Sequence, residues 1–256
     1  METVKIRYNT LDEARGFAVL CMVFYHAFYT MAWMFSMPLG EVLLNFFAPA
    51  EPFFAAFFIF LSGVCCSFSH SNLARGIKLA VVALLLTAVT LILPYFNIEG
   101  AEIYFGILHL LSCGMLLVGL LNKVIKAIPI PIGAILFFIL FLAFYNIENG
   151  YIGFGEFSLQ MPHHLYENNS LFILGFHSWN FYSADYFPIL PWIFMFISGA
   201  FVGLLAPAGK FPHFLTKKRI PPFAFVGRHA LIIYLAHQPL IYGVLFLVDH
   251  VIMDIV

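Results

Sequence analysis

The sequence predicts an all-α fold: a polytopic membrane helix bundle of about seven transmembrane helices, forming one integral-membrane domain over residues 1–256. Its composition is 62% hydrophobic and only 10% charged, whereas a soluble domain carries about 25% charged residues. Several apolar runs approach the roughly 20 residues that cross a ~30 Å hydrocarbon core. The runs are continuous rather than alternating, so we expect helices, which satisfy their own backbone hydrogen bonds in lipid.

The first three expected spans are separated by breaks of proline, glycine or charge. The first covers residues 11–35, opens with the charged stretch LDEAR and contains His26. A Pro-Leu-Gly break and two further prolines precede the second span, residues 53–68. The polar loop SHSNLARGIK leads into the third, residues 77–95. The apolar run behind the N-terminal segment is too long for a signal peptide, so no cleavable signal is expected.

Four more spans follow, and the connection between the fifth and the sixth is long, at about residues 146–186. The seventh begins near Phe223 and extends toward Val251. Pro239 is its expected kink, because proline lacks a backbone donor and clashes one turn back. The other three cover residues 103–121, 132–145 and 187–205.

The basic residues predict the orientation. All twelve lysines and arginines lie in the N-terminal segment, in alternate connections or just inside the seventh span. By the positive-inside rule the N-terminus is cytoplasmic, and with seven spans the C-terminus faces out. The loop at 146–186 then faces outward, and its aromatic, acidic and histidine residues suit a carbohydrate-like or lipid-headgroup acceptor better than an anion.

His26 is the first candidate functional residue. Ionisable groups inside a bilayer are costly and usually face a bundle interior or a wet cavity. Arg15 precedes it by eleven positions, so the two share one helical face about 16 Å apart along the axis. Neutral imidazole suits the general base of an acyl transfer near pH 7. The alternative is a histidine satisfied by a hydrogen bond within the bundle.

The opening stretch LDEARGFAVL, with Arg15 and His26, resembles the start of acyltransferase-3 type membrane proteins. Together with FIFLSGVCCSFS, GILHLLSCGMLL, FPILPWIFMFISG and FVGRHALIIYLAHQPLIYG, it is similar over nearly the whole chain to the bacterial family related to the catalytic domain of heparan-alpha-glucosaminide N-acetyltransferase. The resemblance implies an enzyme that moves an acyl group, usually acetyl, from acyl-CoA on the cytoplasmic side to an acceptor sugar or similar compound across the membrane. Acetyl-CoA or another acyl-CoA is then the co-substrate.

The same resemblance implies roles for individual residues. His26 matches the intramembrane catalytic position, and Arg15 matches the arginine of the opening motif. Arg75 and Lys78, three residues apart, resemble the paired basic residues that hold coenzyme A. The alternative is that they only reflect the positive charge that cytoplasmic loops of membrane proteins usually carry. Asp12 lies three residues before Arg15; it either orients the arginine toward coenzyme phosphates or forms a snorkelling interfacial ion pair.

Two further histidines and one carboxylate complete the candidate site. His237 and His109 are expected about 13 Å and about 10 Å inside their spans, so the three histidines are candidates to line one cavity, His237 in catalysis and His109 at the substrate. Packing or an interhelical hydrogen bond is the alternative for each. Asp185 is either an acceptor ligand or a charge at a helix N-terminus. The paired histidines in MPHHL lack a third partner, and the four cysteines lack ligand spacing, so no metal site is predicted.

The sequence therefore predicts an acyl-CoA-dependent O- or N-acyltransferase, multi-pass in the bacterial inner membrane. The alternative is a small-molecule or proton-coupled transporter, in which intramembrane histidines relay protons or bind substrate. Expected partners are membrane lipids and a small-molecule or glycan acceptor, with a homodimer as a further option. A net charge of -1 without a long basic run argues against nucleic acid.

Overall fold

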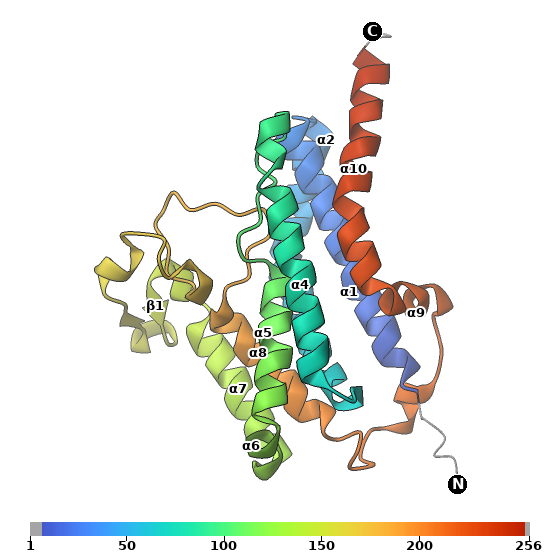
Figure 1. Cartoon of the computed structure of the whole chain (residues 1–256), viewed down its shortest axis with the longest axis vertical. Helices are drawn as coiled ribbons and strands as arrows, with labels where there is room; N and C mark the ends of the chain where they lie inside the picture. Colours follow the sequence, from blue (N-terminus) through green and yellow to red (C-terminus); the bar gives the residue numbers. More distant parts are fainter. Residues whose placement is uncertain (1–6, 254–256) are drawn as a thin grey trace. The chain divides into compact units, whose positions relative to one another are not determined.

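In the computed structural model, which describes residues 7–253, the chain divides into two compact units. The first comprises residues 1–61 and 211–256, and the second residues 62–210. Both units are helical, in agreement with the expected all-α class (Figure 1). The division into two units does not test the expected single domain, and each unit is described by itself below.

The first unit holds both chain ends and five named helices. α1 continues without a break into a π-helical turn, η1 (Thr30–Met34), and α2 begins with a proline, which suits a first turn that lacks hydrogen-bond acceptors for its N–H groups. The last residues of α3 belong to the second unit. The helices are α1 (Asn9–Tyr29), α2 (Pro38–Phe47), α3 (Glu51–Val64), α9 (Pro221–Arg228) and α10 (Ala230–Met253).

α1 and α9 cross at backbone contact, and two glycines make this crossing possible. A Cβ atom on Gly16 of α1 would lie 1.9 Å from the carbonyl oxygen of Phe223 in α9. A Cβ atom on Gly227 of α9 would lie 1.9 Å from the carbonyl oxygen of Asp12 in α1. No side-chain carbon fits at either position, so the two helices can approach this closely only because both residues are glycine.

The expected seventh span is broken, but not at Pro239. α9 ends at Arg228, and His229 leaves the helical region with φ -104° and ψ 19°. α10 then begins at Ala230 and runs through Pro239 as one continuous helix. The break at His229 was not foreseen in the sequence, and the kink expected at Pro239 stays a prediction, because a proline is tolerated inside a long membrane helix.

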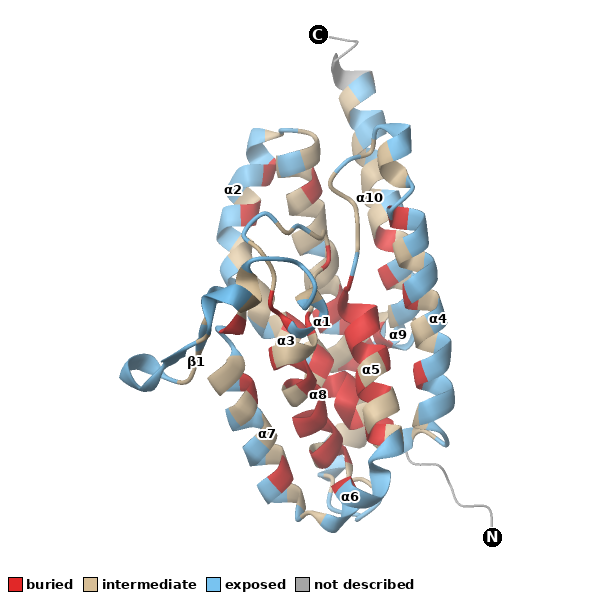
Figure 2. Ribbon diagram, turned by 60° about the vertical axis from the view of Figure 1, so that its left-hand side comes forward, coloured by how far each residue is buried: buried red, intermediate tan, exposed pale blue. Residues whose placement is uncertain are grey.

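The second unit is built around α5 and α8, which are its most buried helices (Figure 2). Phe196 and Phe201 of α8 have no exposed surface. Their rings press against Gly114 of α5 and Gly133 of α7, where a Cβ atom would lie 2.6 Å and 2.3 Å away. The helices are α4 (Asn72–Thr90), α5 (Ile107–Leu120), α6 (Asn122–Ala127), α7 (Ile130–Phe144) and α8 (Ile189–Gly203).

Within residues 7–253, five helical stretches are long and apolar enough to cross a membrane, so seven spans and the orientation are not confirmed. They are Asn9–Met34, Pro38–Phe68, Asn72–Phe96, Ile130–Asn149 and Ala230–His250. The expected fourth and sixth spans correspond to α5 and α8, of 14 and 15 residues. At 1.5 Å per residue, each is only about 21–23 Å long. Gly106 precedes α5 and Pro188 precedes α8 in extended conformations, so the helices start later than the hydropathy suggested.

Between α7 and α8 the chain forms the long loop that the sequence predicted. It consists of 3₁₀ turns and a short antiparallel pair, β1 (Tyr151–Ile152) and β2 (Leu159–Gln160), in which Tyr151 pairs with Gln160. Short strands cannot bury an apolar face of their own, so side-chain contacts hold this segment together.

Candidate functional site

Two histidines face each other across α1 and α10 in the first unit. The ring centroids of His26 and His237 lie 4.9 Å apart, with the ring planes inclined by 54°. His237 is only 6% exposed, and His26 is half-buried. Two imidazoles this close in a region of apolar side chains form the strongest candidate for chemistry in this unit.

Hydrogen bonding fixes which nitrogen of His237 carries the proton. Its Nδ1 lies 2.5 Å from the carbonyl oxygen of Tyr234, so Nδ1–H is the donor. In the neutral ring the other nitrogen, Nε2, then holds a free lone pair. Nε2 is buried and has no hydrogen-bond partner within the described part of the chain. The ring is thus oriented from one side and able to accept a proton on the other.

Thr30 and Gln238 lie beside this histidine pair, and neither was recognised in the sequence. The Thr30 hydroxyl lies 3.4 Å from the Gln238 side-chain oxygen, to which it donates, and Thr30 is 1% exposed. Thr30 is also the first residue of the π-helical turn η1. Such turns are rare and occur frequently at functional sites. The available signal was the spacing: Thr30 follows His26 by one helical turn, on the same face.

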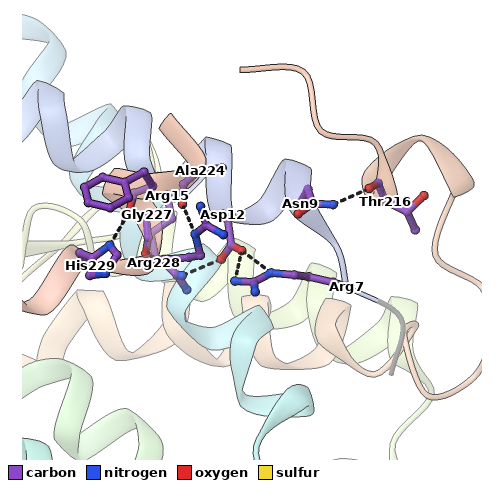
Figure 3. Close-up of polar contacts among 10 residues, drawn as sticks. Arg7, Asn9, Asp12, Arg15, Thr216, Ala224, Gly227, Arg228 and His229 are labelled. Carbon is purple, nitrogen blue, oxygen red and sulfur yellow. Dashed lines mark hydrogen bonds and ion pairs between the residues drawn. The ribbon is translucent and has the colours of Figure 1, made fainter. Parts of the chain in front are cut away.

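At the other end of α1, the predicted ion pair between Asp12 and Arg15 is present (Figure 3). Arg15 Nη2 lies 2.8 Å from Asp12 Oδ1, and its Nε donates to the carbonyl oxygen of Gly227 at 2.6 Å. Arg7 Nη2 binds the second carboxylate oxygen of Asp12 at 2.8 Å. Asp12 therefore lies between two arginines, and Arg15 links α1 to α9. Its role toward coenzyme phosphates stays a prediction.

Glu13, which the sequence analysis did not select, holds the start of α9. Its side chain is only 6% exposed, and Oε1 accepts hydrogen bonds from the backbone N–H groups of Arg219 at 2.6 Å and Ile220 at 2.9 Å. A carboxylate just before a helix start also interacts favourably with the helix dipole. Two backbone N–H donors thus share one acceptor, a single carboxylate oxygen of Glu13.

Replacing Glu13 with alanine is expected to destabilise the protein by about 1–3 kcal/mol, because two backbone N–H groups lose their hydrogen bonds to a buried carboxylate. Glu13→Gln keeps an acceptor oxygen and should lose less. Thermal melts of the purified protein measure both. Equal melting temperatures for Glu13→Ala and the unmodified protein would contradict this role.

His109 and Asp185 belong to the second unit, where both hold the start of α5. His109 Nδ1 accepts from the N–H of Gly106 at 3.2 Å, and its Nε2 lies 3.3 Å from the Thr87 hydroxyl. Asp185 Oδ2 accepts from the N–H of Ile107 at 3.0 Å. Both side chains are buried, at 7% and 6% exposure. The alternatives set out above were a charge at a helix N-terminus for Asp185 and packing or an interhelical hydrogen bond for His109, and these contacts agree with both. Substrate binding by either residue stays untested.

Arg75 and Lys78 lie in the first two turns of α4. Both are exposed, and within residues 7–253 neither side chain forms a hydrogen bond or an ion pair. Their charges are therefore available to a phosphate, although no contact tests the predicted coenzyme role. Among the described residues, no group of three or more His, Cys, Asp or Glu side chains could hold a metal ion.

In the long loop, His177 connects the end that follows α7 with the end that precedes α8. Its Nε2 lies 3.7 Å from Glu148 Oε2, and its ring packs against Phe181 and Tyr186 with centroid distances of 5.0 Å and 5.3 Å. The Tyr186 hydroxyl donates to the carbonyl oxygen of Phe172. The Glu148 carboxylate raises the pKa of His177 above its ordinary value, although burial opposes this shift.

We expect the loop to be more stable at pH 6 than at pH 8. Because the folded pKa of His177 is raised, its contact with Glu148 contributes fully below the unfolded pKa of about 6.5 and is lost as pH rises through the folded value. Glu148→Gln should abolish the difference, whereas Glu156→Gln should preserve it. Hydrogen–deuterium exchange over residues 146–186, corrected for the intrinsic rates, measures this. Equal protection at both pH values would contradict it.

The fold and the site define a multi-pass membrane protein with a pair of close histidines and a basic cluster at one end of its first helix. Over residues 7–239 the sequence matches the profile of the family described as "Heparan-alpha-glucosaminide N-acetyltransferase, catalytic". The chain belongs to this family, as its sequence motifs indicated. No curated protein and no solved structure matches it at the threshold applied.

Proposed function

We propose that this chain is an acyl-CoA-dependent acetyltransferase of the bacterial inner membrane, which passes an acetyl group from acetyl-CoA on the cytoplasmic side to an extracytoplasmic sugar or related acceptor. Membership of the acetyltransferase family supports the reaction class. The observation on which the mechanism depends is the buried Nε2 of His237, which has no partner within the described residues, in a ring whose centroid lies 4.9 Å from that of His26.

His237 is the general base in this proposal. The hydrogen bond from Nδ1–H to the Tyr234 carbonyl fixes the tautomer and stabilises the positive charge that forms when Nε2 takes a proton. The acceptor hydroxyl or amine loses that proton to Nε2 as its oxygen or nitrogen attacks the thioester carbonyl. The carbon–sulfur bond then breaks, and the coenzyme leaves as a thiol after receiving the proton.

His26 supports the same step from α1. The sequence analysis assigned the base to His26, but its ring forms no hydrogen bond within the described residues that would fix a tautomer. We therefore propose that His26 donates an N–H hydrogen bond to the thioester carbonyl oxygen. This hydrogen bond strengthens as negative charge develops on that oxygen in the transition state. In the second unit, the exposed Arg75 and Lys78 of α4 are the proposed contacts of the coenzyme phosphates, on the basis of their charge.

The test uses the purified full-length protein in lipid nanodiscs. A ligand that binds only the folded state raises its stability, by about 2.7 kcal/mol at a hundred times Kd. Acetyl-CoA should therefore raise the melting temperature, and glucosamine added with it should release coenzyme A thiol, measured with a thiol reagent. A melting temperature that acetyl-CoA and free coenzyme A both leave unchanged would overturn the coenzyme-dependent proposal.

A further inference from the structure

The second unit contains a polar cavity that the proposed mechanism does not use. It has a volume of about 380 Å³ and lies where the start of α4, the end of α5 with α6, and the end of α8 meet. Ligand pockets usually measure about 300–1,000 Å³. The cavity is therefore larger than a single small ion requires. The polar side chains that line it include Ser67, Ser69, His70, Asn72, Asn122 and Lys126.

Most of these polar groups have no partner in the protein. Within residues 7–253, the side chains of Ser67, Ser69, His70, Asn122 and Lys126 make no hydrogen bond or ion pair. All of them can donate a hydrogen bond: the hydroxyls, the amide, the imidazole and the ammonium group. Ser67 and Ser69 are half-buried, whereas His70, Asn122 and Lys126 are exposed and are hydrated without a ligand. Five donors around one cavity suit a ligand rich in acceptor oxygens.

The charge of the lining points the same way. Lys126 and His70 line the cavity, and no aspartate or glutamate does so. The 19-residue helix α4 begins here, capped by Ser71, whose hydroxyl oxygen accepts from the N–H of Ala74 at 3.2 Å. A helix start adds partial positive charge and free N–H groups. Together these groups form an environment for an anion.

Asn72 adds a requirement that a bare anion does not meet. Its Nδ2 donates to the carbonyl oxygen of Cys66 at 3.1 Å, which fixes the orientation of the amide. Its Oδ1 is buried and has no partner within the described residues. Because an amide oxygen only accepts hydrogen bonds, a ligand that contacts it directly presents a hydroxyl or N–H group.

We infer that this cavity binds a phosphate ester whose phosphate oxygens face Lys126, His70 and the seryl hydroxyls, while a hydroxyl or amine of the same molecule reaches Asn72 Oδ1. Two sources supply this chemistry: the headgroup of an anionic lipid, since basic pockets among membrane helices recognise such headgroups, and a soluble nucleotide bisphosphate. The inference does not depend on acetyl transfer, because it concerns binding at residues that the mechanism above does not use.

The experiment measures ligand-dependent melting of the full-length protein in a neutral, phosphate-free detergent. One arm uses short-chain phosphatidic acid with diacylglycerol as its phosphate-free control, and the other uses adenosine 3′,5′-bisphosphate with adenosine as its control. We expect one phosphate ligand to raise the melting temperature while its control does not. The arm that responds identifies the source, and the failure of both arms would overturn the inference.

Two variants tie the response to the cavity. Lys126→Gln removes the ammonium charge, and Asn122→Asp introduces a carboxylate without changing the side-chain volume. Each should weaken apparent binding about tenfold or more, the loss expected for one charge-assisted contact. Lys123→Gln is the matched control, because Lys123 lies on the same helix and does not line the cavity. Equal weakening in all three variants, or in none, would overturn the assignment to this cavity.

Discussion

Replacing His237 with alanine is expected to lower the rate of acetyl transfer by about 10²–10⁴-fold, the usual contribution of a positioned general base. Among the described side chains of α10, this imidazole alone combines an orienting hydrogen bond at Nδ1 with a buried nitrogen that has no partner. Release of coenzyme A thiol at saturating acetyl-CoA measures the effect. The melting shift caused by acetyl-CoA should persist in the variant, because the proposed role lies in the chemical step and not in binding.

Comparison with His26 separates the two imidazoles. His26→Ala should reduce turnover less than His237→Ala, and His237→Gln, which keeps a polar group but takes up no proton near pH 7, should be as impaired as His237→Ala. His250→Ala, an exposed histidine near the end of the same helix, is the control and should retain full activity. If His237→Ala kept its turnover while His26→Ala lost it, the base would be His26.

The local part of this site was predictable from the sequence. Arg15 and His26 lie on one continuous helix, as their spacing required, and Asp12 lies within reach of Arg15 one turn away. The long loop and the apolar helices also follow from composition and hydropathy, which are properties of short stretches. Periodicity reports which residues share a face of one helix, and these predictions needed no more than that.

The long-range part was not predictable in the same way. His237 was selected, but its pairing with His26 depends on how two helices more than 200 residues apart pack together, which periodicity does not report. Glu13 appeared to be one of several charges at a membrane edge, and only the position of α9 shows that it is buried. The lengths of α5 and α8 were overestimated because hydropathy counts apolar residues that lie in extended segments before each helix.

Replacing Gly16 with alanine is expected to produce the largest loss of stability among the single substitutions considered. A Cβ atom would lie 1.9 Å from the backbone oxygen of Phe223, so α1 and α9 must separate. Overpacking usually costs about 1–3 kcal/mol and occasionally more, and a rigid backbone neighbour favours the upper part of that range. Gly227→Ala should behave alike, because its Cβ would meet the carbonyl oxygen of Asp12. Thermal melts of the purified variants measure both.

Gly243→Ala is the matched control within α10. Its Cβ would have no atom within 4 Å, so the higher helix propensity of alanine should stabilise the protein by up to about 1 kcal/mol. Glycine-to-alanine substitution is thus expected to lower stability at Gly16 and to raise it at Gly243, because the new methyl group meets a backbone oxygen at Gly16 and open space at Gly243. A lower melting temperature for Gly243→Ala, or an unchanged one for Gly16→Ala, would contradict this account of the crossing.

The two crossing glycines also couple stability to the proposed site. Gly16 follows Arg15 directly, and Arg15 Nε donates to the carbonyl oxygen of Gly227 at 2.6 Å. Separating α1 from α9 therefore breaks that hydrogen bond together with the backbone contact. Because both substitutions disturb one contact, the double variant should lose less stability than the sum of the single losses. Additive losses would show that Gly16 and Gly227 act at independent places, and the helix crossing would not be what positions Arg15.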